Sequence, residues 1–199
     1  MKLHRIVLFG LLCLAVGPGS VGATVGPPLG SMRFSGRGAD MLTSNAQDET
    51  LIAAAPSAVR LKGDITRVLL AEPGGGAVAA KLRALEPDRR VYLIIGNMSA
   101  AEEPGVPYRV FVDLAAGSRG DANSPGYVGT ITFFNAVSLE GTPPESKDTR
   151  FFSFDITRIV GRLQSKNLLT EDTTVTLEAG GEAAPAAHPQ IGRLEIVER

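Results

Sequence analysis

The sequence predicts an all-β domain built as an antiparallel β-sandwich with one short helix. Short runs with strand-like apolar alternation recur from residue 50 to the C-terminus, and stretches rich in Gly, Pro, Ser and Asn separate them. Only one segment carries a clear helical spacing of apolar residues. About eight strands with a single helix favour two packed sheets over a doubly wound parallel sheet.

Residues 1–23 have the pattern of a secretory signal peptide. Two basic residues precede an apolar run over 6–16, and residues 21–23 are small enough for cleavage. A membrane anchor is the alternative, but residues 17–19 interrupt a run that is shorter than the roughly 20 residues a spanning helix needs. We therefore expect a secreted or periplasmic protein with no membrane contact after cleavage.

The remainder is expected to have two parts. Residues 24–48 are rich in Gly, Ser and small polar residues without strand or helix period, which predicts a flexible N-terminal segment. Residues 49–199 contain the strand-like runs and are expected to form the folded domain.

The composition excludes several classes of function. With 20 basic and 21 acidic residues, the chain offers no broad positive face to nucleic acid. Its two histidines are His4 and His188, and its one cysteine is Cys13. Because His4 and Cys13 fall in the signal peptide, the mature chain has no disulfide, no histidine-ligated metal centre and no thiol nucleophile. The sequence therefore predicts a non-enzymatic protein without catalytic, metal-binding or cofactor-binding residues and without a cofactor of its own.

The alternation also places the strands. They are expected at 50–54, 59–70 with a turn at Gly63-Asp64, 91–95, 107–113, 127–137, 150–155, 173–179 and 191–197. The continuous apolar run at 91–95 predicts a central strand buried on both faces. At 107–113 the alternation predicts a half-buried strand with Tyr108, Val110 and Val112 on one face.

One helix is predicted directly after the strand at 150–155. Asp155 stands where an N-cap belongs, and four apolar residues follow on one side of the helix, namely Ile156, Ile159, Val160 and Leu163. Residues 72–88 contain three consecutive glycines and a helix-capable piece at 78–85, so a long connection is expected there. Surface loops are expected at 115–126, 140–149 and 180–190.

Six motifs, taken in order, resemble the C-terminal domain of bacterial tyrosinases and plant polyphenol oxidases. They are Arg90-Val-Tyr-Leu-Ile-Ile-Gly-Asn, Val106-Pro-Tyr-Arg-Val-Phe-Val-Asp, Tyr127-Val-Gly-Thr-Ile-Thr-Phe-Phe, Phe154-Asp-Ile-Thr, Thr174-Val-Thr-Leu and Ile191-Gly-Arg-Leu-Glu-Ile. The resemblance covers 49–199 and rests on the order and spacing of the motifs. It implies a jelly-roll-like β-sandwich that follows or associates with a helical oxidase core, in which histidines hold a pair of copper ions.

This chain departs from the family because it lacks the histidine-bearing core, so the resemblance implies a shielding or folding partner and not the catalyst. Copper is implied only in that partner. In the family and in separate caddie proteins, an aromatic side chain can occupy the copper pocket and hold the enzyme inactive. The candidates here are Tyr127, which we favour because it adjoins a glycine-containing loop, and Tyr108, Phe133 and Phe134. The alternative is that all four are packing residues.

Other patterns favour ordinary surface structure. His188 stands alone in the loop at 180–190, and one imidazole makes a poor metal site. Asp113, Asp121 and Asn123 could supply oxygens to calcium, but they lack the regular ligand series of a calcium loop. The Arg-Gly-Asp tripeptide at 119–121 is better explained as a turn.

The favoured interpretation is an exported, non-catalytic accessory domain that associates with or shields a type-3 copper oxidase, in the manner of a caddie protein. The alternative is a free-standing extracellular module that binds a carbohydrate or a surface protein through the loop at 115–126. The absence of tryptophan weighs against a sugar-stacking surface in that alternative. A third interpretation is a degenerate remnant without a partner.

Overall fold

The computed structural model of the protein describes residues 49–134, 136–137 and 151–199. All of them belong to one compact unit, Ser44–Arg199. The signal peptide expected at 1–23, the segment at 24–48 and the loop expected at 140–149 lie outside the described residues.

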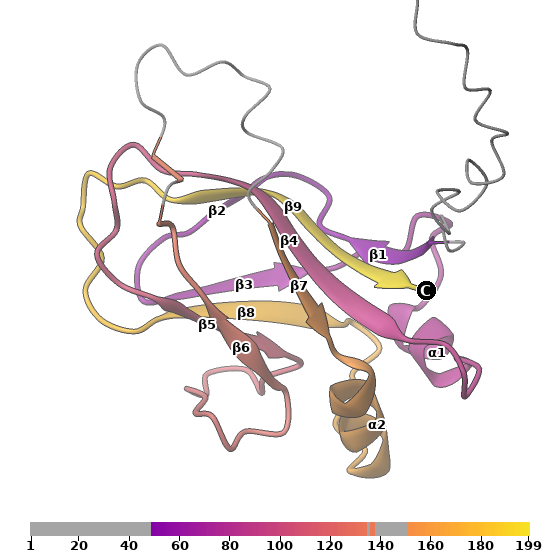
Figure 1. Cartoon of the computed structure of the whole chain (residues 1–199). Coiled ribbons are helices and arrows are strands. Elements are labelled where there is room, and N and C mark those ends of the chain that lie inside the picture. The colour runs from indigo at the N-terminus through magenta and orange to yellow at the C-terminus, as the bar shows by residue number, and fades with distance from the viewer. Residues whose placement is uncertain (1–48, 135, 138–150) are drawn as a thin grey trace, which may run out of the picture. The chain divides into compact units, whose positions relative to one another are not determined.

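The described residues form nine strands in two antiparallel sheets, so the predicted all-β sandwich is confirmed (Figure 1). The five-stranded sheet has the order β1 (Thr50–Ala54), β9 (Gln190–Glu198), β4 (Val91–Ser99) and β7 (Phe151–Asp155), with β2 (Val59–Arg60) also paired to β9. The four-stranded sheet has the order β3 (Ile65–Leu69), β8 (Thr174–Ala179), β5 (Tyr108–Val112) and β6 (Tyr127–Ile131). The sheets lie one above the other in Figure 1, and their inward side chains share one hydrophobic core. Jelly-roll-like connectivity stays a prediction.

Strand β4 is central, as its apolar sequence predicts. It pairs with β9 on one side and with β7 on the other. Leu93 and Ile95 are fully buried, and Ile94 on the opposite face is buried as well. The strand continues beyond the predicted end at Ile95 as far as Ser99.

The expected strand region at 59–70 crosses from one sheet to the other. β2 pairs with β9 in the five-stranded sheet, whereas β3 pairs with β8 in the four-stranded sheet. The predicted turn at Gly63-Asp64 lies between them, and Gly63 has a φ of 63°, a left-handed conformation that glycine adopts without a steric penalty.

Both faces of β5 are buried, which corrects the half-buried strand predicted at 107–113. Tyr108 and Val110 face the core, but Phe111 on the other face is also fully buried. A Cβ added at Gly120 would lie 2.4 Å from Phe111 Cε1, so the loop at 115–126 covers this ring closely. The sequence of a strand predicts which residues alternate between its two faces, but it does not predict that a loop from elsewhere in the chain covers the second face.

Strand β6 ends at Ile131, so the strand predicted at 127–137 is too long. The chain turns just beyond β6, where the amide of Ala136 donates to the carbonyl of Phe133 at 2.8 Å. Phe133 is buried, and insertion of its ring into the core accompanies the end of the strand.

The described residues contain two helices, one more than predicted. α2 (Thr157–Ser165) is the expected helix, and its four predicted apolar residues are all buried. The N-cap is Ile156 and not Asp155, which corrects the prediction: Asp155 ends β7, and its carboxylate accepts a hydrogen bond from the amide of Thr157, the first residue of the helix, at 3.0 Å. α1 (Val78–Arg83) forms within the helix-capable piece and packs beside β1. Neither helix is long and apolar enough to cross a bilayer.

Candidate functional site

Two of the four aromatic candidates are core residues. Tyr108 and Phe133 are each 2% exposed, and their rings meet edge to face with centroids 5.6 Å apart. Either ring would have to leave the core before it could enter a pocket in another protein.

Tyr127 is half-buried on the outer face of the four-stranded sheet. Its ring centroid lies 5.5 Å from that of Phe111, and its hydroxyl is 3.1 Å from Thr130 Oγ1. These two contacts hold the ring against the sheet, so Tyr127 is less available to a partner than its position beside a loop suggests.

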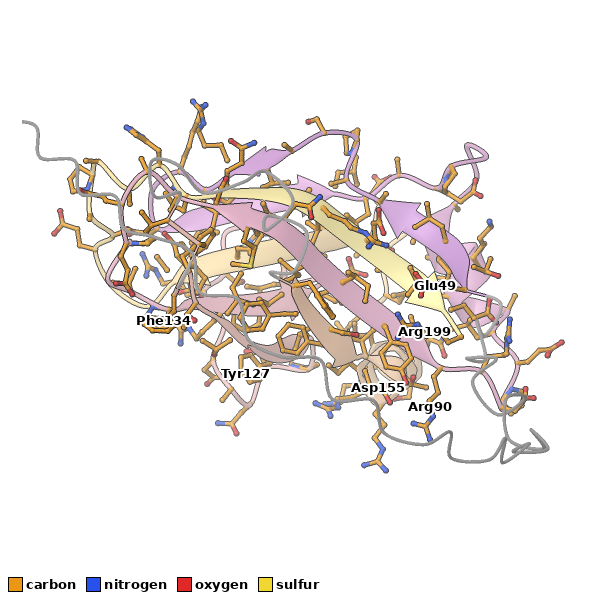
Figure 2. All side chains as sticks on the ribbon, turned by 45° about the horizontal axis from the view of Figure 1, so that its top comes forward. Glu49, Arg90, Tyr127, Phe134, Asp155 and Arg199 are labelled. Carbon is orange, nitrogen blue, oxygen red and sulfur yellow. The ribbon has the colours of Figure 1, made fainter. Side chains whose placement is uncertain are left out.

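Phe134 is the candidate whose ring is open to solvent, with 71% of the residue exposed. The neighbouring Phe133 is buried and anchors the backbone from which Phe134 projects. Figure 2 shows Phe134 well apart from the pair formed by Arg90 and Asp155. Phe134 is thus the most exposed of the four candidates.

A second exposed aromatic, Phe151, was not singled out from the sequence. It begins β7 and is 62% exposed, whereas Phe152 and Phe154 are half-buried and their rings stack at 6.0 Å. The sequence Phe-Phe-Ser-Phe already contains the evidence for this, because alternation in a strand places Phe151 on the face opposite to Phe152 and Phe154.

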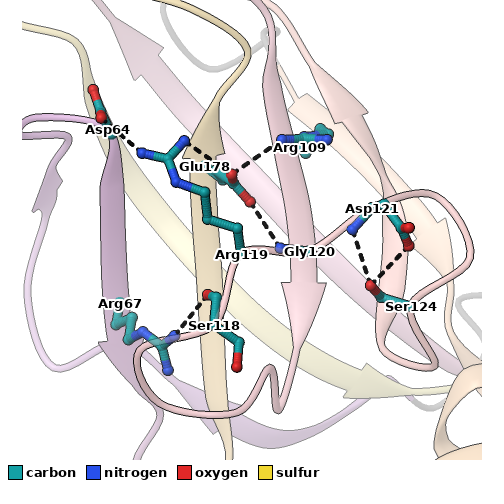
Figure 3. A network of polar contacts seen from close by, with 9 residues as sticks. All are labelled: Asp64, Arg67, Arg109, Ser118, Arg119, Gly120, Asp121, Ser124 and Glu178. Atoms are coloured by element: carbon teal, nitrogen blue, oxygen red, sulfur yellow. Dashed lines mark hydrogen bonds and ion pairs between the residues drawn. The ribbon is translucent and has the colours of Figure 1, made fainter.

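Beneath the loop at 115–126 lies a polar network that the sequence did not reveal (Figure 3). Its centre is Glu178 on β8, whose side chain is 0% exposed. Arg109 Nη2 lies 3.0 Å from Glu178 Oε1, and Arg119 Nη1 lies 3.5 Å from the same oxygen. The amide of Gly120 donates to Glu178 Oε2 at 3.1 Å. A buried carboxylate is thereby neutralised and bonded on both oxygens.

Arg67 on β3 fastens the start of the same loop. Its guanidinium donates to the carbonyl of Leu114 at 2.9 Å and to that of Ala115 at 2.7 Å. Arg119 is also 2.9 Å from Asp64, so the loop is held at several points. Arg119 and Gly120 of the Arg-Gly-Asp tripeptide belong to this network, as Figure 3 shows, and the turn expected at 119–121 begins only at Asp121, whose carbonyl accepts from the amide of Ser124 at 3.1 Å.

The oxygens weighed for calcium have other partners. Asp113 accepts hydrogen bonds from Thr170 and from the amide of Thr174, and burial raises the pKa of Asp113 against the effect of these bonds. Asp121 accepts from the amide of Asn123 at 2.9 Å and from Ser124 Oγ at 3.0 Å, which closes an Asx turn. Within the described ranges, no three His, Cys, Asp or Glu residues gather closely enough to hold a metal ion.

His188 lies in the connection between β8 and β9 with a φ of 44°, which is unusual for a residue other than glycine. Its side chain lines a cavity of about 560 Å³ together with Tyr108 and residues 60–64. His188 is exposed.

Ion pairs also join segments that are far apart in the sequence. Arg199 Nε donates to Glu49 at 2.9 Å, and Arg90 lies 2.9 Å from Asp155 (Figure 2). Hydrogen bonding from Thr157, reinforced by the Arg90 guanidinium, lowers the pKa of Asp155 below its ordinary value. Within each of these pairs, the positive charge of the arginine compensates the negative charge of the carboxylate.

Several solved structures are similar to this chain. Latent apple tyrosinase matches with a TM-score of 0.44 and 14% identity, over 71% of this chain and 27% of that one. Recombinant latent aurone synthase, a polyphenol oxidase, matches with a TM-score of 0.42 and 20% identity, over 70% of this chain and 25% of that one. The same enzyme from its natural source matches with a TM-score of 0.41 and 18% identity, over 69% and 24%. This chain thus spans about a quarter of their length.

No curated protein matches the sequence. One protein family does, and its description is a domain of unknown function, DUF7868. The match covers residues 48–199, which is nearly the same range as the domain expected from the sequence. The chain belongs to the DUF7868 family.

Proposed function

We propose that this protein is an exported, non-catalytic accessory domain that covers the copper entrance of a separate type-3 copper oxidase, with Phe134 as the side chain that enters the pocket. The covering keeps bulky phenols from the copper ions or assists copper loading. Copper belongs to the oxidase in this proposal, and the domain itself holds no cofactor.

The observation that carries the proposal is the exposure of Phe134 directly after a core residue, Phe133. A phenylalanine with 71% of its surface in water gains free energy when a partner covers it. The entrance of a phenol oxidase accepts an aromatic ring, and the Phe134 ring has the size of such a substrate. Because Phe133 is held in the core by its contact with Tyr108, the chain on that side of Phe134 is already ordered before binding.

The sequence resemblance supplies the class of partner. The motifs listed from Arg90 to Ile196 resemble a tyrosinase C-terminal domain, and that family pairs such a domain with a copper oxidase core. The signal-peptide pattern at 1–23 supports export, so the proposed partner is an oxidase that is exported as well.

The test uses the full chain and a type-3 copper oxidase encoded in the same genome. Quinone formation from a bulky phenol is measured while the chain is added up to a molar excess, and copper content is measured in parallel. The wild-type chain is expected to suppress oxidation or raise copper content, and Phe134→Ala to lose most of the effect.

Two matched variants assign the effect to a residue. Leu168→Ala removes another exposed apolar side chain and should act like the wild type. If Tyr127→Ala abolishes the effect while Phe134→Ala does not, Phe134 is the wrong residue although the accessory role stands. If the wild-type chain leaves the activity and the copper content of every co-encoded oxidase unchanged, the accessory role itself is wrong.

A further inference from the structure

A cavity of about 560 Å³ lies at one end of the sandwich, between the turn that joins β2 to β3 and the connection from β8 to β9. Tyr108, which is almost fully buried, lines it together with residues 60–64 and 182–185. Its volume falls in the range of about 300–1,000 Å³ that is typical of small-molecule sites. The size therefore suits a compact organic ligand.

The walls of this cavity are fixed by main-chain hydrogen bonds. The amide of Leu61 donates to the carbonyl of Pro189 at 2.9 Å, and the amide of Ala179 donates to the carbonyl of Asp64 at 2.8 Å. The amide of Ala101 donates to the carbonyl of Ala187 at 2.7 Å. A ligand would thus meet a preformed cavity and would not have to order a loop.

The charges around the cavity favour an anion. Arg60 and Lys62 line it, and neither forms an ion pair with another described residue. Asp64 also lines it, but its carboxylate is already paired with Arg119 at 2.9 Å. Glu182 is then the one acid of the lining without an ion pair to a described residue, against two such cations.

Two further groups can recognise a ligand. The hydroxyl of Tyr108 is protonated at neutral pH, burial raises its pKa further, and Tyr108 lines the cavity. His188 lines the cavity from a left-handed backbone conformation, and such strained residues concentrate at ligand-binding sites. Leu61, Ala184 and Pro185 add apolar wall to these polar groups.

We propose that this cavity binds a small organic carboxylate with an apolar body, whose carboxylate pairs with Arg60 and Lys62 and accepts a hydrogen bond from the Tyr108 hydroxyl while the body lies against Pro185. The assignment goes beyond the accessory role, because it uses a different set of side chains from Phe134 and can hold or fail independently. Benzoate is the simplest probe of this class.

The experiment follows amide shifts of the isotope-labelled full chain while benzoate is added. Saturable shifts are expected in residues 60–64 and 182–189, with a Kd on the order of 1 mM for so small a ligand. Benzyl alcohol has the same ring without the charge and should bind at least about tenfold more weakly. Raising the salt concentration should weaken benzoate binding.

Variants then test the residues. Arg60→Gln with Lys62→Gln should weaken benzoate binding about tenfold, because the carboxylate loses its charged partners. Tyr108→Phe should weaken it severalfold without a shape change. Lys166→Gln, which removes an exposed cation on another surface, should have no effect. The proposal is wrong if benzoate produces no saturable shifts, if benzyl alcohol binds as tightly, or if the double variant binds benzoate within twofold of the wild type.

Discussion

At the scale of single residues, Glu178 shows how a charged side chain can be built into an otherwise apolar sandwich. Its carboxylate is fully buried but meets two guanidinium groups and one main-chain amide. Arg109 and Arg119 keep part of their surface in water, so the network has lower desolvation cost than a fully buried pair. The carboxylate thereby fastens the loop at 115–126 to the sheet.

Substitution Glu178→Gln is expected to lower the free energy of unfolding by about 2 kcal/mol, because it leaves Arg109 half-buried without its counter-charge. Urea denaturation followed by circular dichroism measures the change, since the chain has no tryptophan for fluorescence. The control is Glu171→Gln, which breaks the exposed pair with Arg83 and should cost less than about 0.5 kcal/mol. Equal effects of the two variants would contradict this view of Glu178.

Asp155 predicts a pH dependence of stability. Its pKa is lowered in the folded state, so its contribution is present above the ordinary carboxyl pKa and is lost as the pH falls through the lowered value. The stability difference between wild type and Asp155→Asn should therefore be largest near about pH 7 and shrink below about pH 4. Denaturation across this range measures it. A difference that stays constant with pH would show that the charge of Asp155 does not matter.

At the scale of elements, the sequence correctly predicted the helices and strands whose buried side is determined by their own residues. Helix α2 and strand β4 agree with their predictions because their apolar spacing alone determines which side is buried. The exposure of β5 and β8 was not predictable, since a separate loop covers Phe111, Thr176 and Glu178 from outside. The same reason hid the polar network, because Glu178 has the sequence pattern of a solvent-facing strand residue.

Close packing between this loop and β5 gives a prediction for Gly126. A Cβ at this position would lie 1.9 Å from the carbonyl oxygen of Val112, whose own amide donates to the Gly126 carbonyl. Gly126→Ala is therefore expected to lower the free energy of unfolding by more than about 2 kcal/mol, because main chain must shift to admit the methyl group. A loss below about 0.5 kcal/mol in urea denaturation would contradict the packing.

Helix α2 supplies the opposite case. Gly161 lies inside the helix, and a Cβ added there meets no atom within 4 Å. Gly161→Ala should raise the free energy of unfolding by about 0.5–1 kcal/mol, because alanine loses less backbone entropy in a helix. The same denaturation assay measures it, and a destabilised variant would show that α2 is packed differently.

At the scale of the whole molecule, the order and spacing of the strands were predictable, but the choice among the aromatic candidates was not. The sequence places Tyr127 beside a loop and Phe134 inside the strand predicted at 127–137, and only the folded sandwich shows that Tyr127 packs on Phe111 while Phe134 stays exposed. Which aromatic side chain is exposed thus depends on how β5 and β6 pack against each other, and the pattern of a single strand does not encode this.

The protein is expected to act as a mature chain from which the signal peptide has been cleaved. Cleavage after residue 23 would give a mature chain that begins at Thr24. N-terminal sequencing of the protein recovered from the periplasm or culture medium of its host tests this, and intact-mass measurement checks it. Recovery of the uncleaved chain in the cytoplasm would contradict export and, with it, access to an exported oxidase.

The most direct test of the proposed function is a pull-down of the tagged protein from its native host, with mass spectrometry of the proteins that co-elute. The accessory role predicts a histidine-rich copper oxidase in the eluate of the wild type, with a clearly smaller amount for Phe134→Ala. Glycans or envelope proteins without an oxidase, or no partner at all, would contradict that role and favour a free-standing binding module or a remnant.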